Sequence, residues 1–191
     1  TVGTTPTVSS SRSSARAAAS TPRTARPAEP PAPHPRPAVS VNLAYVGREY
    51  PANAPYSVGR EKLREFAGAV GATHPVHHDL VAARGAGYPD LVAPPTFAVV
   101  VAQRAEGQLI EDPEAGIDFS RVVHADERFT HHRPIVAGDE LVTVLHVDSI
   151  VERAGLAMVT TRCEIAATLA DGGTEPVATV TSTLAVRGEG A

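Results

Sequence analysis

Hydrophobic residues are densest between residues 91 and 110, which read LVAPPTFAVVVAQRAEGQLI. The central TFAVVVA is apolar at every position except Thr96, and a helix that is apolar all round is buried on all sides. Pro94 and Pro95 precede this run, and proline suits the start of a helix, where its missing N–H costs nothing. The stretch is therefore the predicted centre of the fold, and another part of the chain must wrap around it.

The same stretch could also form a buried strand, because residues 99–101 are three consecutive valines. Residues 102–109 are good helix formers apart from one glycine and favour a helix. Gln103, Arg104 and Glu106 interrupt the apolar run well before the roughly 20 residues that a membrane-spanning helix needs. We therefore predict one buried helix that begins near the second proline, and no membrane span.

Shorter patterned segments precede this helix. Residues 60–70 read REKLREFAGAV, and helical spacing places four apolar side chains on one face: Leu63, Phe66, Ala67 and Val70. Gly71 follows where a helix C-cap is expected. Asp79 can cap a short helix over residues 80–84, which glycines then end. Residues 45–57 contain two prolines and predict an irregular edge segment.

After the central helix the pattern changes to a period of two. From Val122, apolar and polar side chains alternate as far as Phe129. Three further runs rich in valine and leucine follow, joined by glycine-containing turns: 140–151, 156–169 and 177–186. Strands joined by tight turns form an antiparallel meander, and strands this long twist and curl. The pattern predicts an α+β fold in which a curled sheet encloses one helix.

Composition separates residues 1–40 from the remainder. This segment holds five arginines and one glutamate, is rich in Ser, Pro and Ala, and predicts a disordered tail. It fits a transit-type presequence, an interaction tail, or a segment without a role. Residues 41–191 form the predicted folded domain and carry 12 basic and 20 acidic side chains, which argues against nucleic-acid binding. The single cysteine, Cys163, excludes an intrachain disulfide and fits a reducing compartment.

The densest group of reactive side chains is GATHPVHHD at residues 71–79. His74, His77 and His78 have a spacing that a metal site can use, but Pro75 disfavours a continuous helix through them. His77 is the better candidate for a general base, because the ordinary histidine pKa suits proton transfer near neutrality. The other two histidines fit a polar loop, and the aspartate at its end fits an N-cap.

Four segments together resemble one known family: VGREKLREFAGAVG, YPDLVAPPTF, DFSRVVHADERF and RPIVAGDEL. In these the chain is similar to the MaoC-like hot-dog dehydratases, which include the (R)-specific enoyl hydratases. The similarity is closest to the accessory, HadA-type subunit of actinobacterial (3R)-hydroxyacyl-ACP dehydratases, which work as heterodimers in type II fatty acid synthesis. It covers residues 46–186 and implies a hot-dog fold, a long antiparallel sheet wrapped around a central buried helix.

In active members of this family the motif reads Gly-Asp-x-Asn-Pro-x-His-x-Asp. The resemblance implies that the histidine removes the α-proton of a (3R)-hydroxyacyl thioester and that the first aspartate helps the 3-hydroxyl leave as water. Here His77 stands at the histidine position and Asp79 at the trailing aspartate. His74 replaces the asparagine, and Ala72, which neither donates nor accepts a proton, replaces the catalytic aspartate.

The family also uses backbone N–H groups at the start of the central helix to hold the thioester oxygen. The usual His-Gly pair there is Pro94-Pro95 in this chain, and proline has no N–H to donate. Thr96 could supply a donor displaced along the helix. The substrate-binding residues that the resemblance implies are Pro95, Thr96 and Phe97.

With two parts of the catalytic apparatus missing, we expect an accessory subunit that shapes the acyl tunnel while a hot-dog paralogue supplies an intact Asp/His pair. The isolated chain is expected to be inactive. Expected partners are that paralogue, or a second copy of the chain, and acyl-ACP or acyl-CoA, but neither nucleic acid nor membrane. We expect no cofactor, no metal and a cytoplasmic location.

Three alternatives stay open. The chain could be a self-sufficient (R)-specific enoyl hydratase or dehydratase that uses His77 and a substitute acid. It could be a hot-dog thioesterase, although such enzymes usually place a carboxylate early in the central helix, where this chain has residues 96–103 without one. It could also be a non-enzymatic acyl-binding protein.

Overall fold

The computed structural model describes residues 41–188. The predictions for the tail, residues 1–40, fall outside this range and stay predictions. The described helices are α1 (Arg60–Ala69), α2 (Leu80–Gly85) and α3 (Ala98–Ile110), and the short 3-10 helices are η1 (Leu43–Tyr45), η2 (Pro75–His77), η3 (Pro113–Ala115) and η4 (Phe119–Arg121). The strands are β1 (Glu49–Tyr50), β2 (Tyr56–Ser57), β3 (Val122–His131), β4 (Glu140–Arg153), β5 (Leu156–Thr168) and β6 (Thr174–Arg187).

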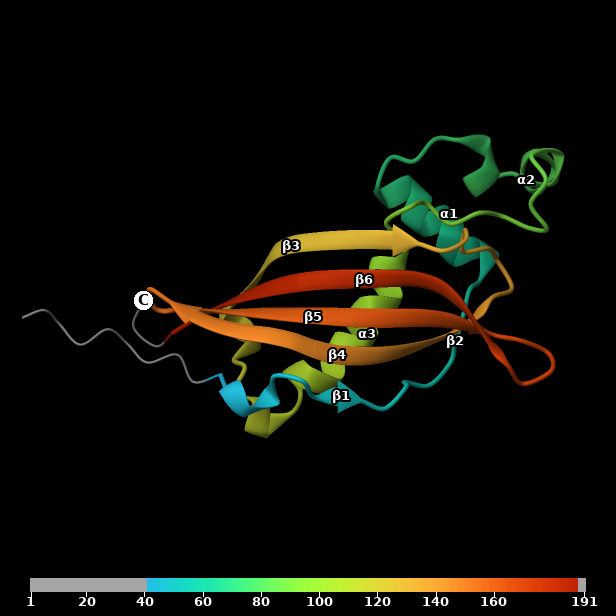
Figure 1. Cartoon of the computed structure of the whole chain (residues 1–191). Coiled ribbons are helices and arrows are strands. Elements are labelled where there is room, and N and C mark those ends of the chain that lie inside the picture. The colour runs from blue at the N-terminus through green and yellow to red at the C-terminus, as the bar shows by residue number, and fades with distance from the viewer. Residues whose placement is uncertain (1–40, 189–191) are drawn as a thin grey trace, which may run out of the picture. The chain divides into compact units, whose positions relative to one another are not determined.

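The strands form one antiparallel sheet in the order β1-β4-β5-β6-β3, and β2 also pairs with β4 (Figure 1). The predicted meander of three long strands is therefore confirmed. Register shifts interrupt β3 after His124, β4 after Val147, and the β5–β6 pair at Ile165. Such β-bulges bend strands and increase their twist, which helps a sheet to curl around a helix.

Helix α3 packs against one face of β4, β5 and β6 (Figure 1). Alternate residues of β5 point toward it and are fully buried, as Val159 and Cys163 are. On the helix, Val101, Ala102 and Ala105 are fully buried as well. The central buried helix and the sheet that covers it confirm the predicted α+β hot-dog fold. No helix in the described range is both long and apolar enough to cross a bilayer.

The central helix begins three residues later than predicted. Pro95 to Phe97 form a turn in which the Phe97 N–H donates to the Pro94 carbonyl oxygen at 2.9 Å, and the Val99 N–H donates to the Thr96 carbonyl oxygen at 3.1 Å. A residue before a proline is disfavoured in the helical region, so Pro94 cannot join the helix ahead of Pro95. These hydrogen bonds join residues three apart, whereas those of an α-helix join residues four apart. The chain therefore enters α3 through a tighter turn.

The amphipathic helix is confirmed as α1. Leu63 and Ala67 are fully buried, and the Phe66 ring meets the Phe97 ring edge-on at a centroid distance of 5.3 Å. Val70, predicted on the same face, is instead 50% exposed, because the helix has already ended at this position. Gly71 follows with a φ of +70°, the left-handed conformation expected after a helix C-terminus. This helix positions the loop that carries the candidate site.

Candidate active site

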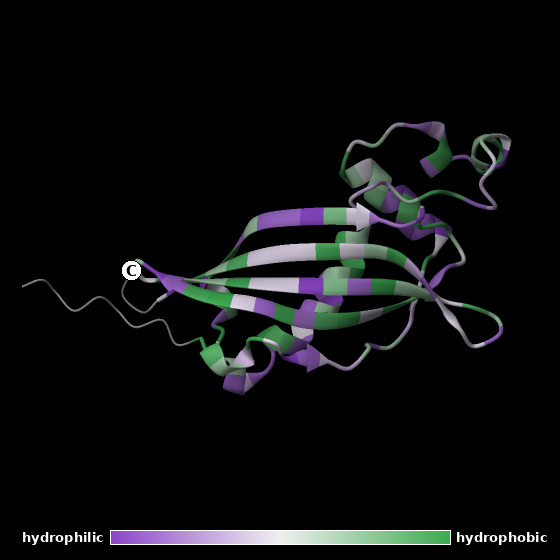
Figure 2. Cartoon of the chain, in the orientation of Figure 1, coloured by the Kyte–Doolittle hydropathy of each residue, from purple (hydrophilic) through white to green (hydrophobic). Residues whose placement is uncertain are grey.

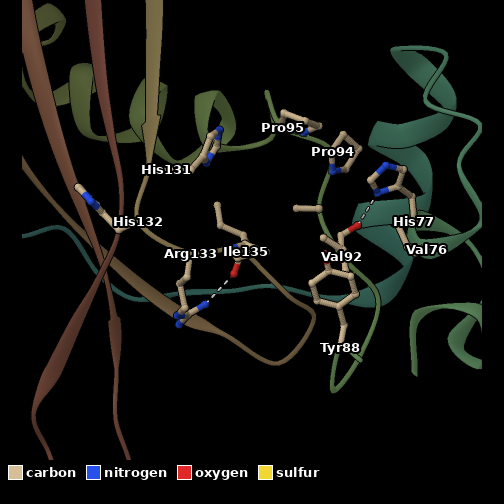
Figure 3. Close-up of a pocket in the computed structure, with 12 residues that line it drawn as sticks. Val76, His77, Tyr88, Val92, Pro94, Pro95, His131, His132, Arg133 and Ile135 are labelled. Carbon is tan, nitrogen blue, oxygen red and sulfur yellow. Dashed lines mark hydrogen bonds between the residues drawn. The ribbon is translucent and has the colours of Figure 1, made fainter. Parts of the chain in front are cut away.

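A cavity of about 430 Å³ lies at the N-terminal end of α3 (Figure 3). Three segments far apart in the sequence form its wall: η2, the residues that lead into α3, and the end of β3 with the turn after it. The lining residues are Val76, His77, Tyr88, Val92, Ala93, Pro94, Pro95, His131, His132, Arg133, Pro134 and Ile135.

Backbone hydrogen bonds hold these three segments together. Val92 forms an isolated antiparallel bridge with Val136, and the Ala93 N–H donates to the Ile135 carbonyl oxygen at 2.8 Å. On the other side, the Val92 N–H donates to the Val76 carbonyl oxygen of η2 at 3.0 Å. The segment before α3 is thus fixed between η2 and the β3–β4 turn, so the wall of the cavity is built from paired backbone.

His77, the predicted general base, lies in this wall and is only 9% exposed. Its Nδ1 is 2.8 Å from the Val92 carbonyl oxygen. A carbonyl can only accept, so Nδ1 carries the hydrogen. In the neutral ring the lone pair is then on Nε2, which is the protonation state that a general base needs.

The neighbouring polar residues have local structural contacts. The His74 Nδ1 accepts from the Val76 N–H and caps η2, while the His78 Nε2 donates to the Ala72 carbonyl oxygen at 2.7 Å. Asp79 accepts from the N–H groups of the first turn of α2, which confirms the predicted N-cap. Within residues 41–188, no group of three His, Cys, Asp or Glu side chains is arranged to hold a metal ion.

The remaining predicted positions differ in their surroundings. Pro95 lines the cavity and is exposed, whereas Thr96 is exposed but is not among the lining residues. Phe97 is fully buried and packs between Tyr56 and Phe66. Ala72 is half-buried in the loop after α1 and is not in the cavity wall.

The structure adds residues that the motif did not reveal. Tyr88 comes from the loop after α2. His131 is the last residue of β3 and lines the cavity together with Pro95, near the N-terminal end of α3 (Figure 3). The His131 partner in β6 is the buried Ala178, so His131 lies on the face of the sheet that α3 covers. Alternation along the strand could have placed it there once the pairing register was known.

Arg133 also lines the cavity, but other groups bind its guanidinium. It donates to both Asp139 oxygens at 2.9 and 3.0 Å and to Glu175 at 2.7 Å. The hydrogen bonds that Arg133 donates to Asp139 are the largest cause of a raised Arg133 pKa, and they outweigh the opposing effect of partial burial. Arg133 therefore fixes the β3–β4 turn, which forms part of the cavity wall. Among the described residues, none that lines this cavity is a carboxylate.

Comparison with known proteins identifies related sequences. Residues 44–180 match the model of the family described as "FAS1-like, dehydratase domain region". A UPF0336 protein of Saccharopolyspora erythraea is 54% identical over 148 residues, which cover 78% of this chain and 92% of that protein. A UPF0336 protein of Leifsonia xyli is 53% identical over 151 residues, or 79% of this chain and 99% of that one.

Solved structures with the same fold are also similar in sequence. A chain of the HadBC (3R)-hydroxyacyl-ACP dehydratase complex of Mycobacterium tuberculosis is 35% identical, with a TM-score of 0.63 over 76% of this chain and 98% of that one. A MaoC-like dehydratase is 38% identical, with a TM-score of 0.68 over 76% of this chain. The match spans 43% of that longer protein.

Proposed function

The chain belongs to the FAS1-like dehydratase-region family of MaoC-like hot-dog proteins, and from this premise we propose that it is the accessory subunit of a (3R)-hydroxyacyl-thioester dehydratase of fatty acid synthesis. A paralogous hot-dog subunit supplies the intact Asp/His pair, and this chain shapes the space for the acyl group. The thioester carrier is ACP or CoA. The similarity to a chain of the HadBC complex, whose name describes a two-subunit dehydratase, supports this proposal.

The proposal rests on one observation: the cavity contains a general base, His77, but no carboxylate that could act as the general acid. Dehydration requires a group to take the α-proton and a group to protonate the departing 3-hydroxyl. His77 has the tautomer for the first step. For the second, no carboxylate lines the cavity among the described residues, and Ala72 stands at the family's aspartate position.

The thioester oxygen also lacks its usual support. Charge develops on this oxygen when the α-proton leaves, and N–H groups at a helix N-terminus normally stabilise it. Pro94 and Pro95 have no N–H, so Thr96 is the first residue of this turn with a backbone donor. Both defects lie in the same transition state, which supports a role in which the partner performs the chemistry.

A second candidate is a self-sufficient hydratase, because Tyr88 and His131 line the same cavity as His77 and both can donate a proton. The thioesterase alternative has less support. The α3 carboxylate Glu106 is buried, bonded to Thr161 and not part of this cavity.

The experiment is to co-purify the chain with its paralogue from the native host and to assay hydration of a trans-2-enoyl thioester by each subunit and by the complex. The proposal predicts turnover by the complex and almost none by this chain. Turnover by this chain alone that is lost in His131→Gln would support the self-sufficient enzyme instead. Binding of acyl thioester without turnover in either form would support the acyl-binding alternative.

A further inference from the structure

A second cavity adjoins the candidate active site. It measures about 320 Å³, and its lining residues are Tyr88, Pro89, Arg133, Pro134, Val136 and Asp139. Three of them, Tyr88, Arg133 and Pro134, also line the cavity that contains His77. The two cavities are therefore neighbours with a shared wall. The first, at about 430 Å³, is near the lower end of the range for small-molecule sites. A ligand too long for it would extend into its neighbour.

Of the three shared wall residues, Tyr88 is the one whose side chain can turn. The Arg133 guanidinium is held by Asp139 and Glu175, and the Pro134 ring is locked to its own backbone. Within residues 41–188 the Tyr88 hydroxyl has no hydrogen-bond partner, and the side chain is half-buried. Its ring can therefore change rotamer without breaking a polar contact.

The backbone that carries this ring is fixed on both sides. The Tyr88 N–H donates to the Ala83 carbonyl oxygen at 3.1 Å, and the Gly87 N–H donates to the Arg84 carbonyl oxygen at 3.0 Å. Gly87 has a φ of +90°, which glycine adopts without strain. On the other side, the Arg84 Nε donates to the Pro89 carbonyl oxygen at 3.4 Å. The shared wall is therefore opened by the ring and not by the loop.

The opposite direction, from the first cavity into the core, is filled. Phe97, Ala98 and Val101 at the start of α3 are fully buried, and Figure 2 shows mostly hydrophobic residues in this part of the helix. A close-packed interior leaves no room for an additional chain. Figure 3 shows Tyr88 on the far side of the cavity from Pro95. An acyl group whose thioester end lies at the start of α3 therefore extends toward Tyr88.

The second cavity suits a hydrocarbon chain better than the arm of the thioester carrier. Apart from one ion pair, its lining is a tyrosine, two prolines and a valine. The ion pair is Arg133 with Asp139, and the Asp139 carboxylate also accepts a hydrogen bond from the Val136 N–H at 2.9 Å. These charges already compensate each other. The carrier arm contains amide groups and a phosphate, which are costly to bury without polar partners.

We propose that Tyr88 sets the length of the acyl group that the candidate site accepts. With the ring in its present position, the acyl chain ends against Tyr88. With the ring turned away or removed, the chain continues into the second cavity, between Pro89 and Val136. This rests on the proposed function in requiring that an acyl thioester binds in the cavity of His77.

The test measures binding to the full chain by isothermal titration calorimetry and does not depend on turnover. The probes are S-butyryl-pantetheine and S-octanoyl-pantetheine, which carry the arm that ACP and CoA share. Each methylene that becomes buried strengthens binding about fourfold. Wild type should prefer the octanoyl probe by less than about threefold, and Tyr88→Ala should prefer it by about tenfold or more. Tyr88→Phe is the matched control, because it keeps the ring and should keep the wild-type preference.

Equal preferences in wild type and Tyr88→Ala, or the same gain in Tyr88→Phe, would overturn the proposal, and so would failure of every variant to bind either probe. If Tyr88→Ala does not fold by circular dichroism, Tyr88→Leu replaces it with the same expected gain, because leucine also lacks the ring. A gain in Tyr88→Ala beside an inactive complex with the paralogue would contradict the proposed function alone. An unchanged preference beside an active complex would contradict the role of Tyr88 alone.

Discussion

His77 and Val92 are joined by a hydrogen bond of 2.8 Å from the imidazole Nδ1–H to the carbonyl oxygen, across 15 residues of sequence. The bond connects the histidine of η2 to the segment that leads into α3. It fixes both the direction of the ring and its neutral tautomer, so the Nε2 lone pair is the one available for chemistry. The chain therefore retains a correctly prepared base, although its expected acid is missing.

This relationship leads to a prediction for the complex. Asparagine can still donate a hydrogen bond from the Nδ1 position to Val92 but has no counterpart of Nε2. If the partner performs the chemistry, His77→Asn should change turnover by the complex less than about threefold, whereas loss of an acting general base costs about 10²–10⁴. Steady-state assays of wild-type and variant complexes at equal concentration measure this. A loss of a hundredfold would mean that His77 is the working base.

The Arg60–Asp90 pair predicts how stability responds to acid. Arg60 donates to both Asp90 oxygens, at 2.8 and 2.6 Å, and this lowers the pKa of Asp90 to about 2. Because the folded-state pKa lies below the unfolded value of about 4, the contribution is present above pH ~4 and is lost as pH falls toward about 2. Asp90→Asn should destabilise the protein by about 1 kcal/mol or less at neutral pH.

Urea denaturation as a function of pH checks this prediction. The stability difference between wild type and Asp90→Asn should disappear between about pH 4 and pH 2. Lys62→Gln, which removes an exposed pair with Glu65, is the control and should have little effect at either pH. A wild-type advantage that persists undiminished in acid would contradict the assigned role of Arg60.

Phe97 should be important for stability. The ring is fully buried and contacts Tyr56 and Phe66, so it joins α1 to the start of α3. Phe97→Ala should cost about 3–5 kcal/mol in the free energy of unfolding, through lost burial and a cavity. Val81→Ala, at a side chain that is 80% exposed, should change it by less than about 0.5 kcal/mol. Equal effects of the two substitutions in denaturant titrations would contradict this packing.

Much of the fold could be predicted because its largest elements have strong local patterns. The all-apolar run predicted α3, the alternating run from Val122 predicted β3, and the valine- and leucine-rich runs between glycine-containing turns predicted β4, β5 and β6. Glu106 shows where the patterns fail. A glutamate in a helix is ordinarily at the surface, but Glu106 is buried and accepts a hydrogen bond from Thr161 of β5, with Ser182 and Glu127 alongside in the next two strands. That arrangement depends on register, which the sequence alone does not reveal.

The site was predictable in part for the same reason. His77 could be identified because its motif is local in the sequence. Tyr88 and His131 join it only through the pairing of residues 91–93 with residues 135–137, which brings separate loops to one cavity. His131 lies between the segments that carry the family resemblance, and no local rule indicated that it faces the start of α3.

The central claim is that this chain cannot complete the reaction alone, because acid and oxyanion donor are both missing. Loss of a donor costs about 10²–10³ in rate and loss of a general acid about 10²–10⁴. Either repair alone, Ala72→Asp or Pro95→Gly, should therefore leave the chain nearly inactive. The two together should gain more than the single changes predict, because both groups act in one transition state.

The decisive measurement is the rate at which each purified variant, without partner, hydrates a trans-2-enoyl thioester. The account predicts almost no turnover for wild type and for the two single variants, and a clear gain for the double variant. Ordinary enzyme rates from wild type, or from Ala72→Asp alone, would contradict it, because Pro95 would then be no handicap and no catalytic partner would be needed.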